Sequence, residues 1–266
     1  MSLRWLAFGI LSFAAACSSG YSQYYTDYSQ GIDYIAPPSK APEIVNVPGT
    51  PQEVVYSMFT NGYKLIGESS FNGPSEDTSG AIAQAKKVGA EYVVLTSEYT
   101  NTVSGAVPLT TTKTITSNTT GTATAYGTGG MATGYYNGTT TTTVPSTTYI
   151  PYSTRRYDQN ALYFAPMTEP CLGVFPEELN DTEKSALGTN KGFRVAAVRK
   201  GSPAYDADIL PNDYILEVNG RPITDAPPPS AVENAELLIV RRVGSRSERL
   251  MISLVTGTGC TPLTDG

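Results

Sequence analysis

The segment from Gly192 to Ile223 limits the possible folds more than any other part of the chain, because strand patterns and turn residues follow one another at short intervals. Gly192 to Val198 alternates as a half-buried strand does. Ser202-Pro203-Ala204 can open a short turn of helix. Ile215 to Val218 is a second strand pattern, closed by Asn219-Gly220, a pair suited to a tight turn. The segment therefore predicts a small β-rich domain with a short helix.

The order of these pieces resembles a bacterial PDZ domain. LGVF at residues 172–175 is followed by GFRVAAV, GSPAYDADILPND and YILEVNGRPI, and the likeness covers roughly residues 170–256. It is strongest to the PDZ modules of high-temperature-requirement envelope proteases, which have a short helix where Asp181 to Leu187 lies here. The resemblance implies a C-terminal PDZ-like, partly open β-barrel over residues 166–260, and a binding role.

Two departures from the family pattern concern glycine. The family usually reads Ala-Gly-Leu and Pro-Gly-Asp where this chain has Asp208 and Asn212. Asp and Asn tolerate a left-handed backbone better than other side chains, so we expect the fold to survive both changes. A third departure is the short Asp225 to Ala235 segment with three prolines, which leaves room for about two helical turns in the groove wall.

The resemblance also implies a peptide site formed by Leu172, Gly173, Val174 and Phe175. A partner's extended C-terminus would lie beside Val174 by strand addition, and the N–H groups of residues 172–174 would receive its carboxylate. The next donor toward the ligand would be Pro176, which has no N–H. We therefore expect peptide binding to be weak and to depend on the carboxylate loop and an apolar terminal side chain.

The first 17 residues read as an export signal that ends in a lipobox. Trp5 to Ala16 is an apolar run too short to span a bilayer, and small residues precede Cys17. This arrangement resembles the signal of bacterial lipoproteins, in which the cysteine is acylated, and the alternative is an ordinary signal peptide. Ser18 in place of Asp favours an outer-membrane anchor facing the periplasm or the cell surface.

Two further cysteines flank the PDZ-like region. In an oxidising periplasm Cys171 and Cys260 predict one disulfide, which would join the ends of that domain. Two thiols in a chain without histidine fall short of a zinc shell, so we expect no metal site and no cofactor.

The N-terminal half predicts a small α/β domain over residues 41–165, behind a Tyr/Ser-rich linker over residues 18–40. Thr50 to Asn61 and Ser79 to Val88 read as helices, and Tyr63 to Phe71 and Tyr92 to Thr100 read as strands. This strand-helix-strand order is typical of a crossover unit. With the C-terminal domain and a tail at residues 261–266, the chain is predicted to be α+β.

Residues 105–154 predict a threonine-rich insertion, either a long hairpin arm or a disordered insert. Eighteen threonines lie between Thr110 and Thr148, and Lys113 is the only charged residue from Val103 to Thr154. Thr favours strands, but so few large aliphatic residues cannot bury much of a core. Because the arm would bury so little core, it is expected to be dispensable for folding. Tyr157 to Phe164 then reads as the returning strand.

Composition excludes several functions. A net charge of -6 without a basic cluster argues against nucleic acid, and Arg241-Arg242 reads as a solvated strand end. The absence of histidine removes the Ser-His-Asp machinery that accompanies PDZ modules in proteases. We therefore expect a non-catalytic, lipid-anchored envelope protein whose PDZ-like domain binds a peptide or protein. The alternative is a structural envelope protein in which that fold is only a packing unit.

Overall fold

A computed structural model describes residues 18–32, 34–168, 170–224, 234–243 and 246–256. They divide into two compact units, the arm at Tyr99–Arg156 and a second unit formed by the residues on both sides of it. Both helices and many strands are present, as an α+β chain requires. Within the described ranges, no helix has the length and apolar character needed to cross a membrane.

The N-terminal region is one sheet in the order β1-β3-β5-β4-β2. Its strands are β1 (Tyr25–Asp27), β2 (Glu43–Ile44), β3 (Tyr63–Gly73), β4 (Tyr92–Gly127) and β5 (Gly130–Pro166). β3 pairs antiparallel with β5 and β2 pairs parallel with β4. β3 and β4 are not neighbours, because β5 returns between them.

Helices cover both faces of this sheet. Successive residues of a strand point to opposite faces, so Tyr163 and Phe164 of β5 enter different clusters. Tyr163 packs with Ala81 and Ala85 of α3 (Thr78–Val88), whereas Phe164 packs with Val54 and Met58 of α2 (Pro51–Thr60). The sequence correctly predicts both helices: Thr50 and Glu53 form a capping box, and Gly89 ends α3 in a left-handed conformation.

The expectation of a Tyr/Ser-rich linker over residues 18–40 is wrong for its first part, which is folded. Gly20–Gln23 forms α1, and β1 pairs with β3. Tyr21 is only 4% exposed and packs edge-on against Phe71, while the ring of Tyr25 packs against that of Tyr163. Tyr21 and Tyr25 thus contribute to core packing, whereas Tyr24, Tyr28 and Tyr34 are exposed.

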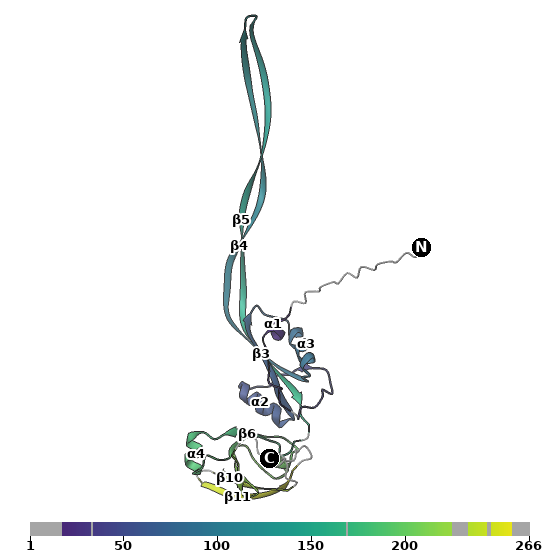
Figure 1. Ribbon diagram of the computed structural model, residues 1–266, viewed down its shortest axis with the longest axis vertical. Coiled ribbons are helices and arrows are strands. Elements are labelled where there is room, and N and C mark those ends of the chain that lie inside the picture. The colour runs from purple at the N-terminus through teal and green to yellow at the C-terminus, as the bar shows by residue number, and fades with distance from the viewer. Residues whose placement is uncertain (1–17, 33, 169, 225–233, 244–245, 257–266) are drawn as a thin grey trace, which may run out of the picture. The chain divides into compact units, whose positions relative to one another are not determined.

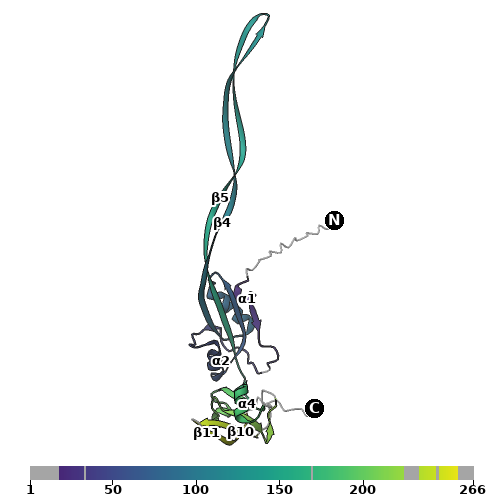
Figure 2. The same cartoon turned by 90° about the vertical axis from the view of Figure 1, so that its left-hand side faces the viewer.

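The arm consists of the distal parts of β4 and β5, which are neighbours in the sheet and are joined at Thr128-Gly129. Almost all of its residues are exposed. Figures 1 and 2 show the two strands coiling about each other along the arm, which is the twist expected of a two-stranded ribbon.

The C-terminal sheet has the order β11-β10-β8-β7-β6, with β9 (Arg221–Pro222) paired to β8, and it does not close into a barrel. Its strands are β6 (Val174–Glu178), β7 (Phe193–Val198), β8 (Tyr214–Val218), β10 (Asn234–Val243) and β11 (Arg246–Val255), with helices α4 (Asp181–Leu187) and α5 (Pro203–Asp206). Asp208 and Asn212 have φ of 55° and 71°, so both adopt the left-handed backbone expected where the family has glycine.

Arg241 corrects a second expectation, since it is not a solvated strand end. Its Nε and Nη2 donate to the carboxylate of Asp213 at 2.8 and 2.7 Å. Asp213 is 1% exposed and also accepts the N–H of Leu210 at 2.9 Å. The hydrogen bond with Asp213 raises the pKa of Arg241 above its ordinary value, against the opposing effect of burial. Arg241 therefore serves as the counter-ion of a buried carboxylate.

Candidate functional site

β6 is the terminal strand of the C-terminal sheet, and it follows directly on the loop formed by Leu172 and Gly173. Among the described strands only β7 pairs with it, in antiparallel register from Val174↔Val198 to Glu178↔Phe193. Its other side is thus an unpaired edge, of the kind that can accept an additional strand.

The peptide groups of the loop are oriented by two hydrogen bonds. The N–H of Ala204 donates to the carbonyl of Leu172 at 2.9 Å, and the N–H of Arg199 donates to the carbonyl of Gly173 at 2.8 Å. In a trans peptide the N–H points opposite to the carbonyl of the same group. The N–H groups of Gly173 and Val174 therefore point away from α5 and β7, toward the free edge.

The register of β6 gives the same orientation for Val174. Gly173 and Arg199 flank the Val174↔Val198 pair, and the N–H of Arg199 donates to the carbonyl of Gly173. In an antiparallel ladder this pattern makes Val174↔Val198 a non-hydrogen-bonded pair. The N–H and C=O of Val174 itself thus face outward. This is the orientation that a peptide strand added beside Val174 would need.

Gly173 is the position at which the loop requires glycine. Its φ is +85°, and a Cβ built there would overlap the Cβ and Oγ of Ser202. Ser202 is fully buried and caps α5 by accepting the N–H of Tyr205 at 3.3 Å, so it has little freedom to move. The close approach of loop and helix cap is what brings the Leu172 carbonyl to Ala204.

Leu172 and Val174 have side chains in the domain core. Leu172 is 9% exposed within the cluster that includes Phe193, Ile215 and Leu237, and Val174 packs against that cluster. They hold the loop in place, and the peptide-binding role that the sequence assigns to residues 172–174 stays a prediction.

Phe175 behaves differently from its expected role, because its side chain packs against α2. Its ring lies 5.3 Å from the rings of Tyr56 and Phe59, both edge-on, and the ammonium of Lys64 lies 5.2 Å from its centroid. All of these residues belong to one compact unit. Phe175 can therefore offer a peptide its backbone, while its side chain anchors β6 on α2.

The outward alternation of β6 continues to Pro176. The ladder has an irregularity between Phe175 and Pro176, where Pro176 pairs with Val195. Pro176 offers no donor to the edge. The opposite wall of the expected groove, residues 225–233, lies outside the described residues.

Cys171, which precedes the loop, is disulfide-bonded. Cys17 and Cys260 both lie outside the described residues, so pairing with Cys260 stays a prediction. Acylation of Cys17 stays a prediction for the same reason.

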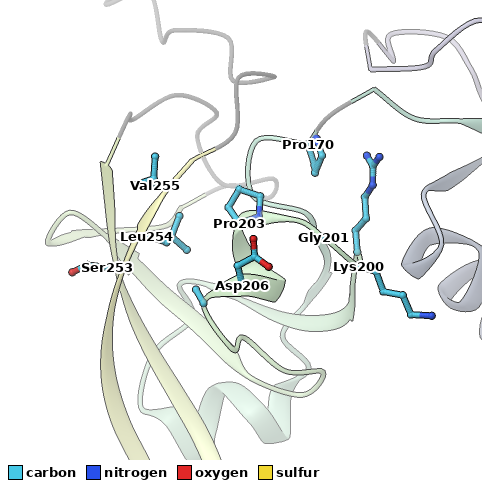
Figure 3. A pocket seen from close by; sticks show the side chains of 10 residues that line it. Pro170, Lys200, Gly201, Pro203, Asp206, Ser253, Leu254 and Val255 are labelled. Carbon is cyan, nitrogen blue, oxygen red and sulfur yellow. The ribbon is translucent and has the colours of Figure 1, made fainter.

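A cavity of about 570 Å³ lies between α5 and the end of β11, and Pro170 is among the residues that line it (Figure 3). Pro203 and Asp206 face it from α5, and Leu254 and Val255 from β11. Its cations have partners elsewhere: Lys200 donates to Asn61 at 3.3 Å, and Arg199 donates to the carbonyl of Thr168.

Sequence reasoning missed the residues that position the loop, namely Arg199, Ser202 and Ala204. The motif GSPA was identified only as the start of a helix. A serine cap followed by proline does predict that start, but the bond from Ala204 to Leu172 depends on the tertiary structure.

Comparison with solved structures gives matches that cover part of the chain. Two are titled as the HtrA-type protease AlgW with decapeptide, one of them a serine-to-alanine variant. Both are 19% identical to this chain. The variant has a TM-score of 0.27 and the match covers 38% of this chain and 37% of that one. The other has a TM-score of 0.25, with 38% of each chain covered. This chain thus spans less than two fifths of the length of these proteases.

Among curated proteins no match is found. The model of one family does match, at residues 194–228, beginning within β7. That family is the PDZ domain, so the chain contains a PDZ domain at these residues.

Proposed function

We propose that this chain is a non-catalytic binding protein whose PDZ domain takes up an extended C-terminal segment by strand addition at β6. The observation that carries the proposal is the orientation of Val174, whose N–H and C=O face the unpaired edge. A peptide strand laid there would satisfy them. The N–H groups of Gly173 and Val174 would receive the terminal carboxylate, whose charge strengthens such hydrogen bonds.

The edge also sets a limit on affinity. A strand added to β6 would meet donors on alternate residues, and the position after Val174 is Pro176. One ladder bond is lost there, so the loop and the terminal side chain must supply most of the binding free energy. Weak binding that depends on the free carboxylate is the expected behaviour.

Replacing Pro176 with valine is expected to tighten peptide binding about three- to tenfold, because the restored N–H adds one hydrogen bond of about 0.5 to 1.5 kcal/mol. Isothermal titration of the full chain with an extended peptide ending in phenylalanine measures the change. Pro222→Val, in exposed β9, is the matched control and should leave the affinity unchanged.

The same titration tests the proposed function itself. The C-terminally amidated form of the peptide should bind neither the wild-type chain nor Pro176→Val. If the free-acid peptide fails to bind both proteins, strand addition at β6 is refuted. If the free-acid and the amidated peptide bind equally well, the N–H groups of Gly173 and Val174 do not receive the terminal carboxylate.

The second candidate is a structural role in which the domain is a packing unit. One observation favours it: Phe175, on the strand that would receive the peptide, is engaged with Tyr56 and Phe59 of α2. In that case no apolar-ended peptide would bind, and Phe175→Ala would destabilise the unit without any binding phenotype.

The location that fits this role is the outer membrane, with a lipid on Cys17 as the anchor. Support comes from the apolar run that ends in three alanines before Cys17. We expect the mature N-terminus to be a diacylated or triacylated Cys17. Mass spectrometry of the N-terminal peptide would instead find an unmodified cysteine if the segment were an ordinary signal peptide.

A further inference from the structure

The two strands of the arm are held in one register along its length. The side chains of Ser104 and Ser153 hydrogen-bond across the arm at 3.1 Å, and those of Thr110 and Thr147 at 3.1 Å. Even-numbered residues of β4 therefore share one face of the arm with odd-numbered residues of β5. Odd-numbered residues of β4 and even-numbered residues of β5 form the other face. The rings of Tyr152 and Tyr136 lie over Gly105 and Gly121 on that other face, which keeps the same register.

This register gathers every valine, leucine and isoleucine of the arm on one face, which we call the apolar face. They are Val103, Val107, Leu109 and Ile115 of β4 and Val144 and Ile150 of β5. Val107 is 55% exposed, Leu109 48% and Ile150 50%. Apolar side chains lined up on one face of a ribbon indicate a surface that is covered in the assembled state.

Toward the tip the apolar face continues in small residues. Gly121, Ala123 and Ala125 of β4 lie there with Ala132, Gly134 and Gly138 of β5. The opposite face of the same stretch carries mainly threonines, with Asn118, Tyr126, Met131, Tyr135 and Asn137 among them. The ring of Tyr136 lies over Gly121 on the apolar face, so a partner's backbone could approach closely only beside Ala123, Ala125, Ala132 and Gly134.

The length of the arm matches the area that a stable interface requires. Within the arm β4 runs for 29 residues (99–127) and β5 for 27 (130–156), which at about 3.3 Å per residue gives a length of roughly 90 Å. Two strands about 4.8 Å apart present a face about 10 Å wide, or roughly 900 Å². A stable interface buries about 800 Å² per partner. An isolated two-stranded ribbon is at best marginally stable in water, so the arm gains most by being covered.

The charge of the arm identifies its partner. Lys113 is the only charged residue from Val103 to Thr154. At an odd position of β4, Lys113 lies on the apolar face between Leu109 and Ile115. A partner chosen by charge complementarity would find only this one cation to recognise, and a second arm would meet repulsion only where its own Lys113 comes close. We propose that the arms of two copies of this chain pack against each other through their apolar faces.

Sedimentation velocity of the full chain tests this packing. The wild-type chain should self-associate. Lysines at Val107 and Leu109 would place like charges in the contact and should raise the dissociation constant more than about a hundredfold. Lysines at Thr110 and Thr112, on the opposite face at the same depth, add the same charge and should change it less than about threefold.

Because the substituted side chains are exposed, each variant is expected to keep the melting transition of the wild-type chain, which calorimetry verifies. A monomeric wild-type chain would overturn the proposal. An equal effect of the two lysine pairs would also overturn it, since the contact would then run along the strand edges or depend only on net charge.

A photo-crosslinking residue provides a second readout on the intact protein. Placed at Leu109 it should yield a covalent dimer of this chain, and placed at Thr110 it should not. Crosslinking of Leu109 to another protein in place of a second copy would refute the arm-to-arm contact.

Discussion

Replacing Gly173 with alanine is expected to destabilise the PDZ domain by about 2 to 5 kcal/mol and to abolish peptide binding. A left-handed backbone costs a residue with a Cβ about 1 to 2 kcal/mol. The new Cβ would also overlap Ser202, which is fully buried, and such overpacking costs about 1 to 3 kcal/mol more. Relief of the clash would move the loop away from Ala204 and turn the edge amides out of position.

Gly188→Ala separates the two causes. Gly188 has φ of +68° with no atom within 4 Å of a built Cβ, so alanine there carries the backbone strain without the clash. We expect Gly188→Ala to lower the free energy of unfolding by about 1 to 2 kcal/mol and to leave peptide affinity unchanged. Scanning calorimetry compares the two variants. Equal losses of stability would show that Ser202 does not constrain the loop.

Local sequence signals predicted the elements that depend on neighbouring residues. The capping box at Thr50 and Glu53 set the start of α2, and Gly89 set the end of α3. Asn219 and Gly220 both have positive φ, as a tight turn requires. In each case the physical cause lies within a few residues of the signal, so one chain is enough to find it.

Interactions between distant segments were beyond that reasoning. Tyr21 is buried because its ring meets Phe71, and nothing near Tyr21 in the sequence distinguishes it from a solvated tyrosine. Arg241 likewise meets Asp213 only when β10 lies beside β8. Composition alone favoured exposure for both, because tyrosine-rich and charged segments are usually solvated.

The candidate site was predictable to an intermediate degree. The motif LGVF located residues 172–174 of the loop through the resemblance to PDZ domains. The direction of its amides follows from two bonds to Arg199 and Ala204 that no local pattern encodes. The side chain of Phe175 depends on α2, more than a hundred residues earlier, so its packing could not be anticipated.

Removal of the buried carboxylate by Asp213→Ala is expected to cost about 3 to 5 kcal/mol of stability, because it leaves a cation largely buried without its partner. The side chain of Arg241 is 19% exposed and that of Asp213 is 2% exposed, so water can replace little of the lost interaction. The N–H of Leu210 would also lose its acceptor. Chemical denaturation of the full chain, followed by tyrosine fluorescence, measures the change.

Asp208→Ala is the matched control, because Asp208 interacts with the same arginine from an exposed position. Its carboxylate lies 3.8 Å from Nη1 of Arg241, and its side chain is 83% exposed. Exposed ion pairs contribute about 0 to 1 kcal/mol, so this variant should remain close to wild type. Substituting Arg241→Met together with Asp213→Ala removes both charges and should restore part of the stability lost in Asp213→Ala alone. If the double variant is less stable than Asp213→Ala, the cost lies in lost packing and not in an uncompensated charge.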